Sequence, residues 1–169
     1  LAMYQAKAAG RNTLRFFDPE MQATITARSN MEADLHRALR EGQFILFYQP
    51  QSDFATGRLI GAEALIRWRH PERGLLLPGQ FIPVAEESGL IVSIGEWVLR
   101  EACRQACVWR KTGLPSLTIA VNLSARQFAQ ESLAERIGDI LASTCVDPAS
   151  IELEITESVL MTDASMTIA

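Results

Sequence analysis

The stretch Gly61-Ala62-Glu63-Ala64-Leu65-Ile66-Arg67-Trp68-Arg69-His70 decides the fold of this chain. We interpret it as a β-strand, in which successive side chains point to opposite faces. One face then carries only apolar side chains, from Ala62 to Trp68, whereas the other carries Glu63 and Arg67 on either side of Leu65. Because an unpaired charge in a protein core is costly, such charges usually have partners. We expect a divalent metal ion beside Glu63 and a phosphate beside Arg67; the alternative is a half-exposed edge strand on which both charges are solvated.

Composition and charge limit the classes of function. The chain has 169 residues, of which 48% are hydrophobic and 21% are charged, as in one ordinary globular domain. Its net charge of −4 argues against binding of a nucleic acid polymer through a basic surface. No run of 18 apolar residues occurs, so we expect no membrane segment. Three cysteines without framework spacing favour reduced thiols in a cytoplasmic protein.

Periodicity and turn signals predict an alternation of helices and strands. Strands over 44–50 and 59–68, joined by a turn at 55–58, predict an antiparallel hairpin. A loop over 71–83 and a short helix over 80–87 precede a long amphipathic helix over 90–112. A strand over 118–124, a helix over 130–143, a strand over 151–156 and a helical turn over 157–161 follow. This order predicts a parallel sheet covered by helices. The apolar face of the long helix comprises Ile91, Ile94, Val98, Leu99, Ala102, Cys103 and Ala106.

Polar side chains recur near the ends of the two later strands, at Asn122 and Glu154. If Glu63, Asn122 and Glu154 share one concave face, their oxygens suit Mg²⁺ or Mn²⁺ and not zinc. Active sites of (β/α)8 barrels lie at this end of the parallel strands. Spacing alone leaves an alternative open, in which Glu154 is one of several solvated acids between Glu152 and Glu157.

Five blocks of sequence, in order over residues 43–160, resemble the EAL-domain family of phosphodiesterases that hydrolyse cyclic di-GMP. The blocks are Tyr48-Gln49-Pro50, Glu63-Ala64-Leu65-Ile66-Arg67-Trp68, residues 78–86, Asn122-Leu123-Ser124 and Glu154-Ile155-Thr156-Glu157. The resemblance implies an α/β fold, namely a partial TIM-like (β/α)8 barrel with an antiparallel first strand, truncated after about half.

The same resemblance implies roles for individual residues. It implies metal ligation by Glu63, Asn122 and Glu154, with Mg²⁺ or Mn²⁺ as the cofactor, and substrate contacts by Gln49, Leu65 and Arg67. Glu63 and Glu157 are the implied catalytic positions, Glu157 because it matches a residue that steadies an active-site loop. The implied reaction cuts cyclic di-GMP to linear pGpG with a metal-activated water.

The resemblance also implies a division of the chain. Residues 1–17, through Tyr4-Gln5-Ala6-Lys7-Ala8-Ala9-Gly10-Arg11-Asn12, resemble the C-terminal end of a GGDEF domain. Residues 18–42 form a linker helix that begins at Asp18-Pro19, and residues 43–169 form the N-terminal half of an EAL domain. We therefore expect a fragment of a longer protein, without appreciable phosphodiesterase activity alone. The unpaired edge of a sheet interrupted halfway favours a homodimer.

Two other functions stay open at this stage. One is a regulatory module that binds cyclic di-GMP without cutting it. The other is a Mg²⁺-dependent barrel enzyme that acts on a different phosphate ester or on an enolisable acid.

Overall fold

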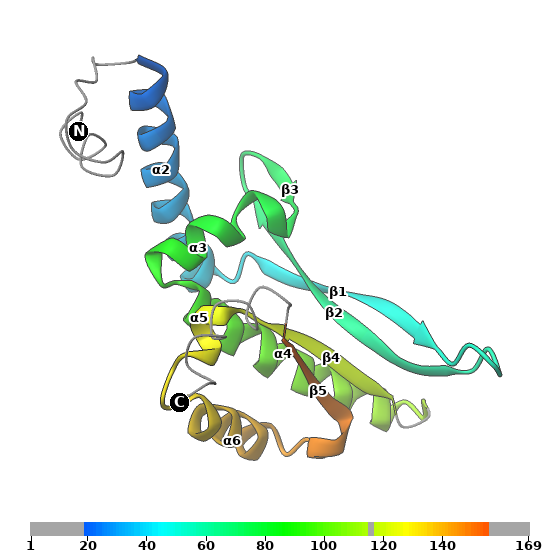
Figure 1. Cartoon of the computed structure of the whole chain (residues 1–169). Helices are drawn as coiled ribbons and strands as arrows, with labels where there is room; N and C mark the ends of the chain where they lie inside the picture. The colour runs from blue at the N-terminus through cyan, green and yellow to red at the C-terminus, as the bar shows by residue number, and fades with distance from the viewer. Residues whose placement is uncertain (1–18, 115–116, 156–169) are drawn as a thin grey trace, which may run out of the picture.

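One mixed sheet organises the protein (Figure 1), for which the computed structural model describes residues 19–114 and 117–155. The strands β1 (Phe44–Ser52), β2 (Leu59–His70), β4 (Thr118–Leu123) and β5 (Ile151–Ile155) lie in that order. β1 pairs with β2 in antiparallel fashion, whereas β2 with β4 and β4 with β5 pair in parallel. The predicted hairpin and parallel sheet are confirmed, and the sheet is an open part of a TIM-like barrel.

Helices connect the parallel strands and pack on one face of the sheet. Along the chain, β2 is followed by α3 (Ile82–Ser88) and α4 (Ile91–Lys111) before β4. β4 is followed by α5 (Ala125–Phe128), α6 (Leu133–Thr144) and a 3-10 turn (Pro148–Ser150) before β5. All seven side chains predicted for the apolar face of α4 are buried. In the part of the chain that the structure describes, no helix is both long and apolar enough to cross a membrane.

An aromatic cluster fixes which face of β2 is inward. Trp68 and Phe81 are fully buried, with ring centroids 5.6 Å apart in an edge-to-face arrangement, and Phe44 lies 5.7 Å from Trp68. Trp68 Nε1 donates a hydrogen bond to Gln43 Oε1 at 3.0 Å, so the indole also has its polar partner. Because side chains alternate along a strand, burial of Trp68 turns Arg67 to the opposite face.

The predicted connector helix is α2 (Pro19–Glu41), which ends at Gly42 with a φ of 65°. Its C-terminal half buries Leu35 and Ala38 against the core, and Figure 1 shows its N-terminal half standing away from the sheet. The buried His70, the last residue of β2, connects this strand to α2. Its Nε2 lies 3.2 Å from a carboxylate oxygen of Asp34, which is a residue of α2.

The tautomer of His70 follows from its second nitrogen. Nδ1 accepts hydrogen bonds from the backbone N–H groups of Glu72 and Arg73 at 3.1 and 3.2 Å. Because Nδ1 accepts these bonds, the ring proton lies on Nε2, which donates a hydrogen bond to Asp34 Oδ2. An ion pair between Arg28 and Glu87 of α3 is a second attachment of α2.

One prediction of local structure was wrong, and one short element was missed. The predicted loop over 71–83 contains β3 (Gly74–Leu76), which pairs with β2 because Gly74, with a φ of 72°, turns the chain back sharply. The helix α5 was missed because it has only four residues. The elements expected within 1–17 and 157–161 lie outside the described residues.

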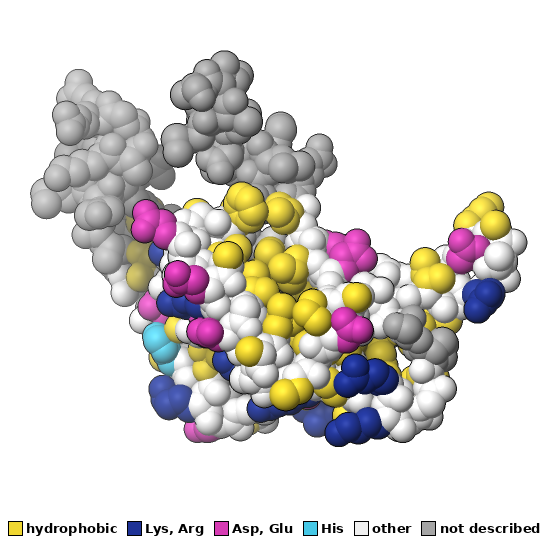
Figure 2. All heavy atoms as spheres, turned by 90° about the horizontal axis from the view of Figure 1, so that it is seen from below, with side chains coloured by type: hydrophobic (Ala, Val, Ile, Leu, Met, Phe, Trp, Pro, Cys, Tyr) yellow, Lys and Arg dark blue, Asp and Glu magenta, His cyan; other side chains and the backbone are white. Residues whose placement is uncertain are grey.

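The β1–β2 hairpin extends past the rest of the sheet as a two-stranded ribbon (Figure 1). At its tip Phe54 is fully exposed, and Asp53 accepts hydrogen bonds from the backbone and hydroxyl groups of Thr56. Figure 2 shows hydrophobic and charged side chains together at this tip. The hydrogen bonds from Thr56 lower the pKa of the Asp53 carboxyl, so the turn carries a negative charge.

Candidate functional site

Strand pairing brings the three predicted metal ligands to one face of the sheet. Glu63 pairs with Ala120 across β2 and β4, and Asn122 pairs with Glu154 across β4 and β5. Paired residues of neighbouring strands point to the same face, and Ala120 and Asn122 share a face because they are two residues apart. Glu63, Asn122 and Glu154 therefore all lie on the face opposite α4.

Glu63 and Asn122 are in direct contact. Asn122 Nδ2 donates a hydrogen bond to Glu63 Oε1 at 2.7 Å, which leaves the Asn122 Oδ1 oxygen free to accept or to bind a cation. Glu154 is half-buried, and its side chain makes no hydrogen bond or ion pair with any residue that the structure describes. Within residues 19–114 and 117–155, neither carboxylate has a Lys, Arg or His in ion-pair range. Among the described residues, neither of these two acids is therefore neutralised by a cationic side chain.

This donor set fits a divalent cation that prefers oxygen. Two carboxylates and an amide oxygen are hard ligands, and Mg²⁺ takes about six oxygens, several of them from water or substrate. Among the described residues no cluster of three or more His, Cys, Asp or Glu side chains could hold a metal ion. The candidate ligand set therefore consists of two carboxylates, Glu63 and Glu154, and becomes three only when the amide of Asn122 is included. Donors of these types suit Mg²⁺ or Mn²⁺ better than zinc.

Arg67 lies on the same face, four residues after Glu63. Its guanidinium carbon is 5.6 Å from the centroid of the Phe47 ring, and Nη1 donates to the Ile66 carbonyl at 2.8 Å. No carboxylate of the described residues pairs with it. The ring and the carbonyl hold the guanidinium without neutralising its charge, which leaves N–H groups for a phosphate.

Gln49 and Leu65 complete the predicted set on this face. Gln49 pairs with Glu63, and Leu65 pairs with Phe47, across the β1–β2 ladder. Gln49 is exposed and Leu65 is half-buried. Their contacts with a substrate stay predictions, and Glu157 lies outside the described residues.

A cavity of about 260 Å³ lies beside Leu65 and Asn122. Its walls are mostly apolar side chains of β2, α3 and α4, and its polar lining includes Glu86 and Gln127. Its volume is close to the lower end of the ~300–1,000 Å³ range of ligand pockets. The cavity lies mainly on the α4 side of the sheet and reaches the face of the oxygen cluster at Leu65 and Asn122.

Sequence reasoning missed one buried polar side chain near the site, that of Gln127. It is only 5% exposed and forms a reciprocal capping box with Ser124 at the start of α5. The signal was present, since Ser124-Ala125-Arg126-Gln127 has the S-x-x-Q spacing of such a box.

A family model and several known proteins match this sequence. The family model described as the EAL domain matches residues 32–168. The bifunctional diguanylate cyclase/cyclic di-GMP phosphodiesterase MucR of Pseudomonas aeruginosa is 48% identical over 163 residues, which are 96% of this chain and 24% of MucR. The cyclic di-GMP phosphodiesterase NbdA of the same organism is 40% identical over 168 residues, which are 99% of this chain and 22% of NbdA.

A solved structure is also similar to this chain, both in fold and in sequence. The PaMucR phosphodiesterase in complex with c-di-GMP matches with a TM-score of 0.76 and 47% identity, over 82% of this chain and 56% of that chain. The chain spans about a quarter of the length of the two curated relatives and about half of the solved chain. The EAL-domain family model covers most residues of the present chain. The chain belongs to the EAL-domain family.

Proposed function

We propose that these residues form the metal-binding half of a phosphodiesterase active site, which in a longer protein hydrolyses cyclic di-GMP to linear pGpG. The observation that carries the proposal is the convergence of Glu63, Asn122 and Glu154 on one face, beside an unneutralised Arg67. The 48% identity to MucR and the match to a c-di-GMP complex support the choice of substrate.

In this proposal each side chain has a defined task. Glu63, Asn122 and Glu154 hold Mg²⁺ or Mn²⁺, which when bound supplies a water of lowered pKa and neutralises phosphate charge. Arg67 binds a phosphate oxygen through charge-assisted hydrogen bonds and orients the ester bond toward the oxygen cluster. Gln49 and Leu65 contact the dinucleotide, and Glu157 steadies a loop of the site.

A chimera with MucR tests the proposal. The 163 aligned residues of this chain replace their equivalents in full-length MucR, and pGpG formation is followed by chromatography with Mn²⁺ present. We expect hydrolysis, and a loss of at least about 100-fold in Glu63→Gln and Asn122→Ala, since loss of an outer-shell partner alone costs ~10–100-fold. Glu131→Gln, which changes an exposed acid before α6, is the matched control and should keep full activity.

Each outcome decides between the candidate functions. A folded chimera that binds cyclic di-GMP without cutting it would contradict the enzyme and favour the regulatory module. A chimera that binds no cyclic di-GMP but hydrolyses another phosphate ester would favour a different substrate. The 169-residue chain alone should bind Mn²⁺ and hydrolyse little, so hydrolysis at the rate of the chimera would contradict a site completed by further residues.

A further inference from the structure

Gln127 is one of two buried polar residues in the described part of the chain, the other being His70. Its Oε1 accepts hydrogen bonds from the backbone N–H and the hydroxyl of Ser124, at 3.2 and 3.0 Å. The Ser124 hydroxyl in turn accepts from the Gln127 backbone N–H at 3.3 Å. This box closes the turn that directly follows β4.

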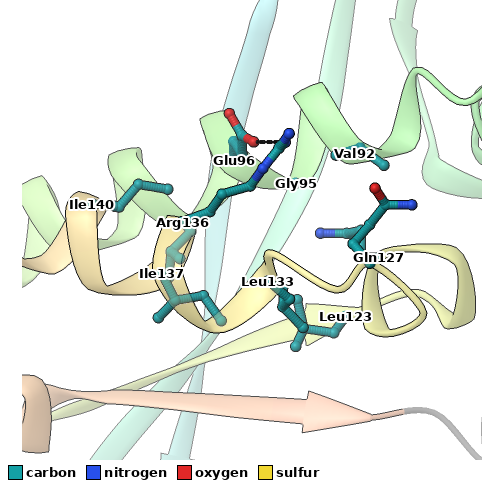
Figure 3. Close-up of a pocket in the computed structure, with 11 residues that line it drawn as sticks. Val92, Gly95, Glu96, Leu123, Gln127, Leu133, Arg136, Ile137 and Ile140 are labelled. Carbon is teal, nitrogen blue, oxygen red and sulfur yellow. Dashed lines mark hydrogen bonds and ion pairs between the residues drawn. The ribbon is translucent and has the colours of Figure 1, made fainter.

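The amide of Gln127 also occupies a space that only glycine leaves open. A Cβ on Gly95 of α4 would lie 1.9 Å from Gln127 Nε2 and 2.5 Å from its Cδ, well inside van der Waals contact. Figure 3 shows Gly95 and Gln127 lining one pocket with Leu123, the last residue of β4. Because glycine within a helix is unfavourable relative to alanine, its presence here has a packing reason.

These contacts connect α4 to the end of the strand that carries Asn122. Ser124 follows Asn122 by two residues, and the cavity beside Asn122 is lined by Leu123, Ser124, Gln127 and Gly95 as well. Asn122 itself is exposed, and its side chain has one hydrogen bond among the described residues, to Glu63. The position of the Asn122 side-chain amide therefore depends on the backbone position at the C-terminal end of β4.

We propose that Gln127, seated against Gly95, is a positioning residue that sets the distance between Asn122 and Glu63 and thereby the affinity for the divalent cation. This inference rests on the proposed function, since it concerns the same metal site. The hydrogen bonds to Ser124 fix the end of β4, and the contact with Gly95 fixes the amide that makes them. Outer-shell groups of this kind tune metal affinity by orienting the ligands.

Two variants of the 169-residue chain separate hydrogen bonding from packing. Gln127→Met keeps the length of the side chain against Gly95 but removes both acceptor bonds to Ser124, whereas Gly95→Ala keeps the glutamine but displaces its amide. We expect both to weaken Mn²⁺ binding about 10-fold, measured by electron paramagnetic resonance titration of the folded protein. Both should also shift the Asn122 side-chain amide resonances in a ¹⁵N–¹H spectrum.

Arg126→Ala is the matched control on the same short helix. Arg126 donates to the carbonyls of Glu86 and Glu87 at the end of α3 and does not enter the Ser124 box. Its loss should lower the thermal midpoint without changing the Mn²⁺ dissociation constant by more than about 2-fold. If Gly95→Ala unfolds the chain, Gly95→Ala with Gln127→Ala restores the space and should fold, with weakened Mn²⁺ binding.

The results separate this inference from the proposed function. Loss of Mn²⁺ binding in Glu63→Gln, with unchanged binding and unchanged Asn122 resonances in Gln127→Met, would overturn the positioning role and keep the metal site. Absence of Mn²⁺ binding by the unmodified chain would contradict the proposed function, and the Asn122 resonances would then decide whether Gln127 positions this side chain.

Discussion

Replacing Asn122 by aspartate perturbs the centre of the candidate site by exchanging a single nitrogen for an oxygen. Asn122 Nδ2 donates to Glu63 Oε1 at 2.7 Å, so Asn122→Asp puts an acceptor where the donor was. Two like charges about 3 Å apart repel by roughly 1.4 kcal/mol in bulk water and by roughly 5 kcal/mol at an effective dielectric constant of 20. Because Asn122 is exposed, we take a value near the lower limit.

The lost hydrogen bond adds to this repulsion. A hydrogen bond to a charged group contributes about 1.5–3 kcal/mol, and less at an exposed site. We therefore expect Asn122→Asp to lower the free energy of unfolding by about 2–4 kcal/mol without metal. For a chain of this size, 1 kcal/mol corresponds to a shift of ~2–4 °C in thermal midpoint, so the midpoint should fall by roughly 4–16 °C.

Thermal unfolding followed by circular dichroism, at low ionic strength and with or without Mn²⁺, measures the effect. A cation held between two carboxylates should stabilise the variant more than the unmodified chain, in proportion to its occupancy. Asn30→Asp makes the same chemical change on the exposed face of α2 and should leave both midpoints unchanged. Equal midpoints for Asn122→Asp and the unmodified chain without metal would refute the contact with Glu63, and equal responses to Mn²⁺ would refute the metal site.

Three further predictions concern the surrounding fold. His70→Phe keeps the ring against Trp68 but removes three hydrogen bonds, so urea unfolding should show a loss of about 3 kcal/mol, and a loss under 1 kcal/mol would contradict the described contacts. Burial, with a smaller effect of Glu101, raises the pKa of the Tyr48 phenol above its ordinary value of 10.0, so the folded state stays neutral where the unfolded state ionises. The contribution of Tyr48 to the free energy of unfolding is complete below about pH 10 and is lost as the pH rises further. The urea midpoint should therefore drop less between pH 9 and 11 in Tyr48→Phe than in the unmodified chain. Equal drops in the two proteins would contradict the raised pKa of Tyr48. Burial also raises the pKa of the Cys103 thiol, whereas Cys145 is exposed, so iodoacetamide at pH 8 should label Cys145 first and Cys103 last, and peptide mass spectrometry giving the reverse order would disprove this.

The long elements were predictable because their periods are distinct. The apolar residues of α4, from Ile91 to Ala106, recur at helical spacing, and every one predicted to face the core does so. Alternation along β2 likewise assigned Trp68 to the core and Glu63 to the opposite face. A period repeated over several turns or pairs is a strong signal.

The short elements were not predictable from periodicity. β3 has three residues and α5 has four, which is too few for a repeat to be recognised. The contact of Gln127 with Gly95 joins residues 32 positions apart, so only the tertiary arrangement shows it. The faces of Asn122 and Glu154 followed from alternation, but that Glu63 and Asn122 touch depends on the register between β2 and β4.

That register has a consequence for insertions and deletions of single codons. Gly61 lies so close to β4 that an added Cβ would be 2.5 Å from the Thr118 carbonyl oxygen, and the ladder from this point places Ala120 opposite Glu63. A slip of one residue would turn Asn122 toward α4 and Leu123 toward the acids. One extra codon inside 118–122 would thus abolish cation binding although every letter of the motif survived. The same insertion at the tip of the ribbon, over 53–58, would leave the site intact.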